Sequence, residues 1–166
     1  CTDIFDEFMD TNLLYQLALS DADDDTILRA FLKAKLPDRL VEDFFAFFDV
    51  VKAPIAIRSS SLLEDSHYQP FAGIYSTYMI PYVDNEDQML RLLLKAVKSV
   101  YASVYFAASR AYIQSSQNLI SEEKMAVIIQ EVCGTEQDVL FEQIEDGWFT
   151  GHAPNGMKVY ARGEDL

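Results

Sequence analysis

An arginine followed by three serines is the part of this sequence best suited to bind a phosphate group. Arg58, Ser59, Ser60 and Ser61 come directly after the apolar run 54–57. A guanidinium presents a planar fork of donors that matches phosphate oxygens, and serine hydroxyls add neutral donors without adding bulk. The sequence therefore predicts an anion-binding site at the end of a short buried strand.

The stretch 59–73 after this strand is predicted to be a loop, because it has no sustained period and is rich in Ser, Asp, Gln, Pro and Gly. Its last residue, Gly73, would let the backbone approach a phosphate closely. The stretch contains neither of the common glycine-rich nucleotide motifs. An alternative stays open, in which Arg58 only forms a surface ion pair with Glu64 or Asp65, worth roughly 0–1 kcal/mol.

The charge of the chain is strongly negative but unevenly distributed. The 166 residues carry a formal net charge of −14, which disfavours general affinity for nucleic acids or anionic membranes. Residues 1–50 hold 12 acidic and 4 basic side chains, whereas residues 51–120 hold 5 acidic and 6 basic ones. A polyanion is therefore expected to bind only locally, in the middle of the chain. The alternative is that the uneven charge distribution only reflects solvated helix faces.

Cysteine usage and hydropathy predict a cytoplasmic protein without a membrane span. Cys1 and Cys133 make no disulfide framework, and the longest apolar runs are far shorter than the roughly 20 residues that a bilayer span needs. Cys133 has no second ligand at metal-binding spacing and is interpreted as a buried structural thiol. Because the sequence begins with Cys1 rather than Met, we expect a piece of a longer protein.

The elements that must position the arginine are mainly helices. Apolar residues predict a first helix over 4–17, a second that begins at Asp24 or Asp25 and extends to Leu32, and a third over 38–52 whose aromatic residues belong to the core. A long helix capped by Asp84 or Asn85 is predicted to continue toward residue 114.

Strands are predicted at 54–57, 74–80 and 125–132, the last of them buried on both faces. Together with the helices they indicate an α/β or α+β domain with a mixed sheet. A boundary is expected near Gly134. Beyond it, short strands at 139–143, 148–152 and 157–161 predict a β-hairpin extension.

The order of these motifs resembles the N-terminal nucleotide-binding domain of the phosphoenolpyruvate synthase and pyruvate phosphate dikinase family, which has an ATP-grasp-type fold. The resemblance covers most of the chain up to about Gly134. The shared features are Arg-Ser-Ser at 58–60, Glu-Asp at 64–65, Phe-Ala-Gly at 71–73, Thr-Tyr at 77–78, Ala102–Tyr105, Ser109–Ala111 and Met125–Gln130, with Leu36–Pro37 upstream.

This resemblance implies a site that holds the phosphates of ATP, with Mg²⁺, while a phosphoryl group passes to a histidine on a separate domain. Two arginines and nearby serines would bind the phosphates, a glycine would face the terminal phosphates, and a glutamine would lie near the adenine. The residues so implied are Arg58, Ser59, Ser60, Gly73, Arg110 and Gln130. An alternative for Arg110, late in a crowded helix, is a snorkelling or ion-pairing role.

Several features of the family are not identifiable in this sequence. They are the glycine-rich segment with a phosphate-binding lysine, the acidic and glutamine residues for metal together with a further arginine, and the carrier histidine. His67 and His152 are interpreted as surface or lid residues. No metal ligands are therefore predicted, and the chain alone is expected to be inactive.

The resemblance implies the ATP-binding part of a phosphotransferase that forms phosphoenolpyruvate from pyruvate, whose partners are the carrier-histidine and pyruvate-binding domains of a parent chain. The alternative is a non-catalytic nucleotide-binding or protein-interaction module with the same fold. The tail is faintly similar to a small RNA-binding β-barrel module, but its 5 acidic and 2 basic residues over 139–166 argue against an RNA surface.

Overall fold

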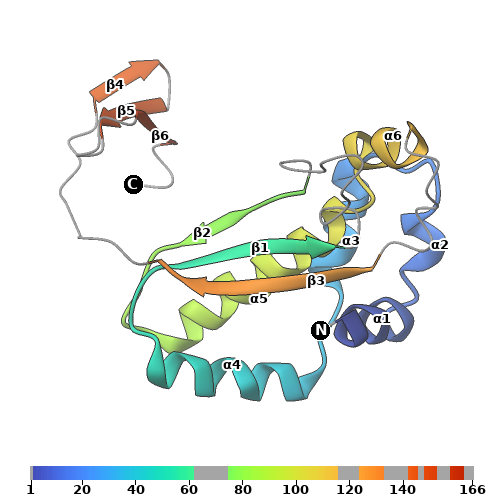
Figure 1. The fold of residues 1–166 in the computed structure, drawn as a ribbon, viewed down its shortest axis with the longest axis horizontal. Helices are drawn as coiled ribbons and strands as arrows, with labels where there is room; N and C mark the ends of the chain where they lie inside the picture. The colour runs from blue at the N-terminus through green and yellow to red at the C-terminus, as the bar shows by residue number, and fades with distance from the viewer. Residues whose placement is uncertain are drawn as a thin grey trace. The chain divides into compact units, whose positions relative to one another are not determined.

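The chain divides into two units, residues 1–132 and residues 133–166, which are described separately. A computed structural model describes residues 2–61, 75–115 and 124–132 of the first unit and three short strands of the second. Figure 1 shows the first unit as a sheet with helices behind and around it. Its elements are α1 (Thr2–Thr11), α2 (Tyr15–Ala18), α3 (Asp24–Lys33), α4 (Asp38–Val50), β1 (Ile55–Ser61), β2 (Tyr78–Ile80), α5 (Glu86–Ser103), α6 (Ala107–Ser115) and β3 (Met125–Glu131).

The second unit forms one antiparallel sheet in the order β4-β5-β6. Its strands are β4 (Glu142–Glu145), β5 (Trp148–His152) and β6 (Lys158–Arg162). The sequence placed strands here, with bounds that differ by one to three residues at β4 and β6. The described helices of the chain include none that is long and apolar enough to cross a membrane.

Helix α5 is the central element of the first unit. The Asn85 side chain caps its first turn by accepting a hydrogen bond from the Gln88 backbone N–H at 2.9 Å, and two acidic residues follow the cap. Apolar residues then repeat at helical spacing and are buried, among them Met89, Leu93 and Val100. The helix contacts α3, α4 and all three strands of the sheet.

The sheet of the first unit has the strand order β2-β1-β3, and both pairings are antiparallel. The prediction of a mixed sheet was therefore wrong for the described strands, and an α+β architecture holds. Strand β1 is also longer than predicted, because it continues through Ser61 instead of ending at Ile57. The paired strand β3 explains this, since the ladder extends from Ile55–Glu131 to Ser61–Met125.

A chain of aromatic rings connects the N-terminal helices to α5. The Phe5 ring lies 5.0 Å from the Tyr101 ring, and the Phe8 ring lies 5.5 Å from Tyr101 and 5.8 Å from Phe31, centroid to centroid. The rings of Phe31 and Tyr105 are 5.9 Å apart. All five are buried, and burial raises the pKa of the Tyr101 hydroxyl above its ordinary value. The α1–α3–α5 interface is therefore a continuous aromatic core.

The helix predicted over 4–17 is interrupted, because α1 ends at Thr11 and the exposed Leu13 has a φ of 52°. The side chain of Asn12 accounts for the stop. Its amide donates to the Phe8 carbonyl at 2.8 Å and to the Lys35 carbonyl at 2.9 Å, and its oxygen accepts from the Lys35 N–H at 2.9 Å. This one side chain caps α1 and fixes the α3–α4 connection to it.

The helix predicted from residue 85 toward 114 is likewise two helices, since the chain leaves α5 after Ser103 and re-enters a helix at Ala107. Asp24 provides the reason, because its carboxylate accepts a hydrogen bond from the Ala107 N–H at 2.8 Å and so caps α6. The cap predicted for α3 is also shifted, since Asp23 rather than Asp24 or Asp25 accepts from the Thr26 N–H.

Arg110 completes the attachment of α6. Its guanidinium donates to the Ser20 carbonyl at 2.7 Å and to the Ala22 carbonyl at 3.0 Å. Together with the Asp24 cap, these bonds fix α6 to the connection between α2 and α3. In Figure 1, α6 and α2 accordingly lie at the same end of the first unit.

Replacing Asn12 tests the role of its side chain. Asn12→Ala removes three hydrogen bonds at once, and we expect the free energy of unfolding in urea to fall by about 1–3 kcal/mol. Asn12→Asp keeps the acceptor for the Lys35 N–H but loses both donors, so its loss should be intermediate. Equal stability of Asn12→Ala and the parent chain would contradict this assignment.

Replacing Arg110 tests the attachment of α6. Because both hydrogen bonds come from a charged donor, Arg110→Ala should lower the free energy of unfolding by about 2–3 kcal/mol. The matched control is Arg29→Ala, which removes an exposed ion pair with Asp25 and should cost at most about 1 kcal/mol. Thermal or urea denaturation measures both, and equal losses would show that Arg110 is no more than a surface arginine.

Candidate functional site

One face of the β2-β1-β3 sheet is buried and the other is open. Residues in register on neighbouring strands share a face, as do alternate residues along a strand. The buried face carries Ile55, Ile57 and Met125, each 0% exposed, and α5 lies against this sheet. The opposite face, called here the open face, consists of Ala56, which is buried, and of Arg58, Ser60, Met79, Ala126, Ile128 and Gln130.

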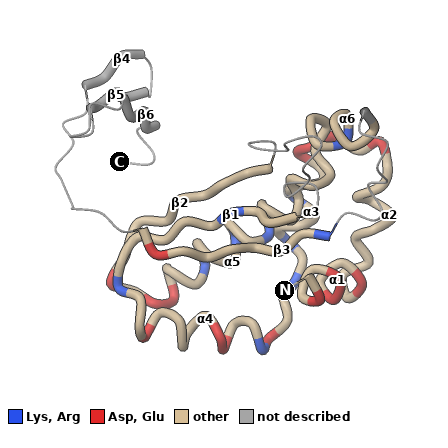
Figure 2. The backbone as a smooth tube through the Cα atoms, viewed as in Figure 1, with Lys and Arg blue, Asp and Glu red and all other residues tan. Residues whose placement is uncertain are grey.

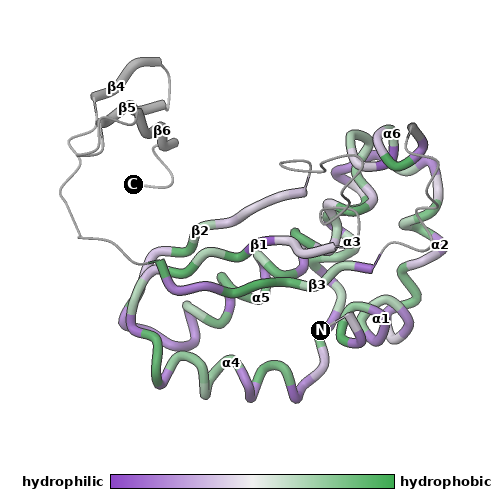
Figure 3. The backbone as a smooth tube through the Cα atoms, in the orientation of Figure 1, coloured by the Kyte–Doolittle hydropathy of each residue, from purple (hydrophilic) through white to green (hydrophobic). Residues whose placement is uncertain are grey.

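The open face exposes large apolar side chains. Met79 is 62% exposed and Ile128 is 41% exposed, although both lie within strands. Figure 3 shows the hydrophobic segments of β1 and β3, and in Figure 1 α5 passes behind these strands. The prediction that β3 is buried on both faces was therefore wrong, because no described element covers its second face. An unbroken apolar run such as 125–129 does not distinguish these two cases.

Arg58 lies in the middle of the open face, in register with Ile128. Its side chain is exposed, and among the described residues none forms an ion pair or hydrogen bond with its guanidinium. Glu64 and Asp65, its alternative partners, are outside the described residues. The arginine is thus a cation set among apolar neighbours, on the side of the sheet that no described helix covers.

The two serines predicted beside Arg58 lie on opposite faces. Ser60 is in register with Ala126 on the open face, whereas Ser59 is in register with Val127 on the other face. Both are within β1 rather than in a loop, contrary to the prediction. The structure therefore brings Ser60, but not Ser59, to the face that carries Arg58.

Gln130 lies on the same open face. It is exposed and in register with Ala56, two residues along β3 from Ile128. Because a strand rises about 3.3 Å per residue, Ser60 and Ala56 are separated by about 13 Å along β1. The open face thus has the Ser60 hydroxyl at one end, Arg58 beside Ile128 in the middle, and Met79 with the Gln130 amide at the other end.

The chain returns from the segment after β1 close to the C-terminal end of α5. Tyr75 is buried, and the Ser76 N–H donates to the Ser103 hydroxyl oxygen at 3.4 Å. The Ser109 hydroxyl donates to the Ser103 carbonyl at 2.6 Å, so α6 begins at the same place. Buried serines therefore hold this return point together. Gly73 and His67 lie outside the described residues.

Arg110 is near this return point through Ser109, but its guanidinium is engaged elsewhere. Two of its five N–H donors bind the Ser20 and Ala22 carbonyls. These two hydrogen bonds are a structural role for Arg110 that the sequence did not predict. No described contact brings the Arg110 guanidinium together with the Arg58 guanidinium.

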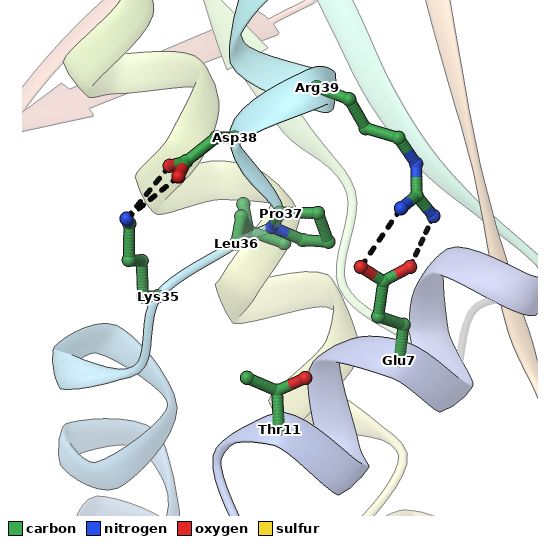
Figure 4. Close-up of a pocket in the computed structure, with 7 residues that line it drawn as sticks. All are labelled: Glu7, Thr11, Lys35, Leu36, Pro37, Asp38 and Arg39. Atoms are coloured by element: carbon green, nitrogen blue, oxygen red, sulfur yellow. Dashed lines mark hydrogen bonds and ion pairs between the residues drawn. The ribbon is translucent and has the colours of Figure 1, made fainter.

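The larger of two described cavities lies away from the open face, between α1 and the start of α4 (Figure 4). Its volume is about 310 Å³, and its cations are paired: Arg39 forms a two-bond ion pair with Glu7, and Lys35 pairs with Asp38. With both cations neutralised, this cavity is a poor phosphate site. Within residues 2–61, 75–115 and 124–132, no group of three or more His, Cys, Asp or Glu could hold a metal ion.

Comparison with known proteins connects this geometry to a family. A family model described as the pyruvate phosphate dikinase AMP/ATP-binding domain matches residues 3–153. The match confirms the resemblance carried by the motifs and extends past Gly134, where we expected it to end. It includes the strands that contain Arg58 and Gln130.

One relative has a stated activity class. The chain is 27% identical over 143 residues to the uncharacterized phosphotransferase YvkC of Bacillus subtilis (strain 168). The aligned part is 86% of this chain but 16% of that protein, so the chain spans less than a fifth of its relative's length. Because the family model covers most of the chain, the protein belongs to the pyruvate phosphate dikinase AMP/ATP-binding domain family.

Proposed function

We propose that the open face binds ATP and that the chain is the nucleotide-binding part of a phosphoenolpyruvate synthase-like phosphotransferase. The observation that carries the proposal is the position of Arg58, an exposed cation on a sheet face that is otherwise apolar or neutral. A nucleotide has a polyanionic end and a planar, largely apolar end. The open face offers a matching contact for each.

The phosphates would lie at the Ser60 end of the open face. There the Arg58 fork and the Ser60 hydroxyl supply donors, and Gly73 would approach from the segment between Ser61 and Tyr75. The base would lie over Ile128 and Met79, with Gln130 offering an amide to its edge. The place of Gly73 near the phosphates is part of the proposal, because Gly73 is not among the described residues.

Arg58 suits phosphoryl transfer because the reaction depends mainly on positioning and on neutralising charge. Within the described residues the chain offers no carboxylate cluster for Mg²⁺, so we assign no step to the metal. The acceptor would be a histidine on another domain of a parent chain, and phosphoenolpyruvate formation from pyruvate would follow there. We also propose that the fold is of the ATP-grasp type.

A second candidate function is a module that binds a nucleotide or a protein without catalysis. The exposure of Met79 and Ile128 favours it, because exposed apolar strand faces also dock proteins. Magnesium dependence separates the two candidates. A phosphotransferase site should bind ATP more tightly with Mg²⁺ in isothermal titration calorimetry, whereas equal affinity with and without Mg²⁺ favours the non-catalytic module.

The contribution of Arg58 can be measured directly. Arg58→Ala should weaken ATP binding by roughly 1.5–3 kcal/mol, because it removes a charge-assisted phosphate contact, and it should leave the melting temperature nearly unchanged. Lys52→Ala is the matched control, since it removes an exposed cation that pairs with Glu86. Titration calorimetry and thermal denaturation supply the two readouts. A large loss of stability with unchanged ATP affinity would make Arg58 structural.

Gly73→Val tests whether the segment before β2 faces the terminal phosphates. A side chain there would be pushed toward these phosphates, so affinity for ATP should fall more than affinity for AMP. In the parent chain, ATP should also slow amide hydrogen exchange across residues 62–73 as the segment closes over the phosphates. Equal losses for the two nucleotides, with exchange unchanged by ATP, would exclude Gly73 from the site.

A further inference from the structure

The cations of the first unit are not evenly neutralised. Five of them pair with carboxylates, in the ion pairs Arg29–Asp25, Lys35–Asp38, Arg39–Glu7, Lys52–Glu86 and Lys124–Asp6. By contrast, six cations form no ion pair with any residue of the described segments: Lys33, Arg58, Arg91, Lys95, Lys98 and Arg110. Arg58 belongs to the open face, and Arg110 donates to two backbone carbonyls. The other four are distinctive in a chain with a net charge of −14.

Three of these cations occupy one side of α5. Arg91, Lys95 and Lys98 follow one another at steps of four and three residues, so they lie within a narrow arc of the helix. Met89 and Leu93 lie about half a turn away and are buried. Figure 2 shows these basic segments of α5 among mostly uncharged backbone. The cations therefore lie opposite the buried side of the helix.

Lys33, in the last turn of α3, lies next to this arc. The Lys98 ammonium donates to the Leu32 carbonyl at 3.3 Å, which brings the last turn of α3 against α5. Lys33 follows Leu32 and is exposed. We call the set Lys33, Arg91, Lys95 and Lys98 the basic surface.

A cavity of about 290 Å³ opens within the basic surface. Lys33, Lys35 and Lys98 line it together with the carboxylate of Asp38, which already pairs with Lys35. The remaining lining residues are apolar: Ala34, Leu36, Val41 and Leu94. The cavity therefore combines an apolar lining with an excess of positive charge, and it is large enough to admit one apolar side chain.

We propose that the basic surface docks an acidic protein segment that inserts an apolar side chain into this cavity. Charge complementarity selects the acidic partner, and the apolar lining selects a protein over a nucleic acid, which has no such side chain. From Arg91 to Lys98 the helix rises about 10 Å, which matches several residues of a segment rather than one small anion.

The environment of Lys98 supports this assignment. Partial burial lowers the pKa of its ammonium, and the Leu32 carbonyl is its one described hydrogen-bond partner. A partner carboxylate beside it would offset that desolvation. The open face with Arg58 is composed of strand residues, whereas the basic surface belongs to α3, α5 and their connections, so the two sites can be tested independently.

The probe is a fluorescein-labelled, ten-residue glutamate-rich peptide with one central leucine, measured by fluorescence anisotropy against the full chain at low salt. We expect binding that weakens with added salt. The double variant with Arg91→Glu and Lys95→Glu should bind the peptide at least about tenfold more weakly. A chain carrying both Lys52→Glu and Lys124→Glu is the charge-matched control, because these cations already pair with carboxylates, and it should lose less than about twofold.

Replacing the central leucine of the peptide by serine should weaken binding, since the cavity then stays unfilled. ATP affinity should be the same in the double variant as in the parent chain, which separates this site from the open face. Three results would overturn the proposal: no binding of the peptide at low salt, equal losses in the double variant and the control, or equal competition by a single-stranded oligonucleotide of the same charge.

Discussion

The burial of α5 is the constraint on which the rest of the first unit depends. Leu93 and Val100 are fully buried, and burial of each such side chain contributes about 1.5–3 kcal/mol. The helix can bury them only if elements pack around it, and the sheet, α3 and α4 do so. Near its C-terminal end, Tyr101 and Tyr105 extend this burial through the rings of α1 and α3.

The same constraint determines which surfaces stay free. A sheet of three strands has two faces, and α5 occupies one of them, so Ile55 and Ile57 are buried while Arg58 and Ile128 are exposed. The opposite arc of α5 stays in solvent and can carry Arg91 and Lys95. The candidate nucleotide site and the basic surface are thus both consequences of how one helix is packed.

Much of the fold could be predicted from the sequence, because hydrophobic period and capping act locally. The α4 helix, the Asn85 cap and the strands of the second unit follow from such signals. The two helix breaks could not be predicted. They depend on Asn12 reaching Lys35 and on Asp24 reaching Ala107, and contacts between residues so distant in sequence leave no periodic signal.

The candidate site could be predicted only in part. The position of Arg58 at a strand could be predicted. The placement of Ser59 and Ser60 on opposite faces could not, because it follows from the extension of β1 through Ser61. The exposure of Met79 and Ile128 needed the tertiary structure, since an apolar residue in a strand is usually buried. Arg110 was assigned by resemblance to phosphate binding, and its contacts with Ser20 and Ala22 were not foreseeable.

Methyl NMR with labelled methionine and isoleucine tests the central claim most directly, because the two faces of one sheet carry separate probes. On addition of ATP with Mg²⁺, the Met79 and Ile128 methyl resonances of the open face should shift. Those of Met125 and Ile57 on the buried face should shift far less, since α5 shields them. Shifts confined to the buried face or to α5, with Met79 and Ile128 unchanged at saturating ATP, would contradict the assignment of the nucleotide site to the open face.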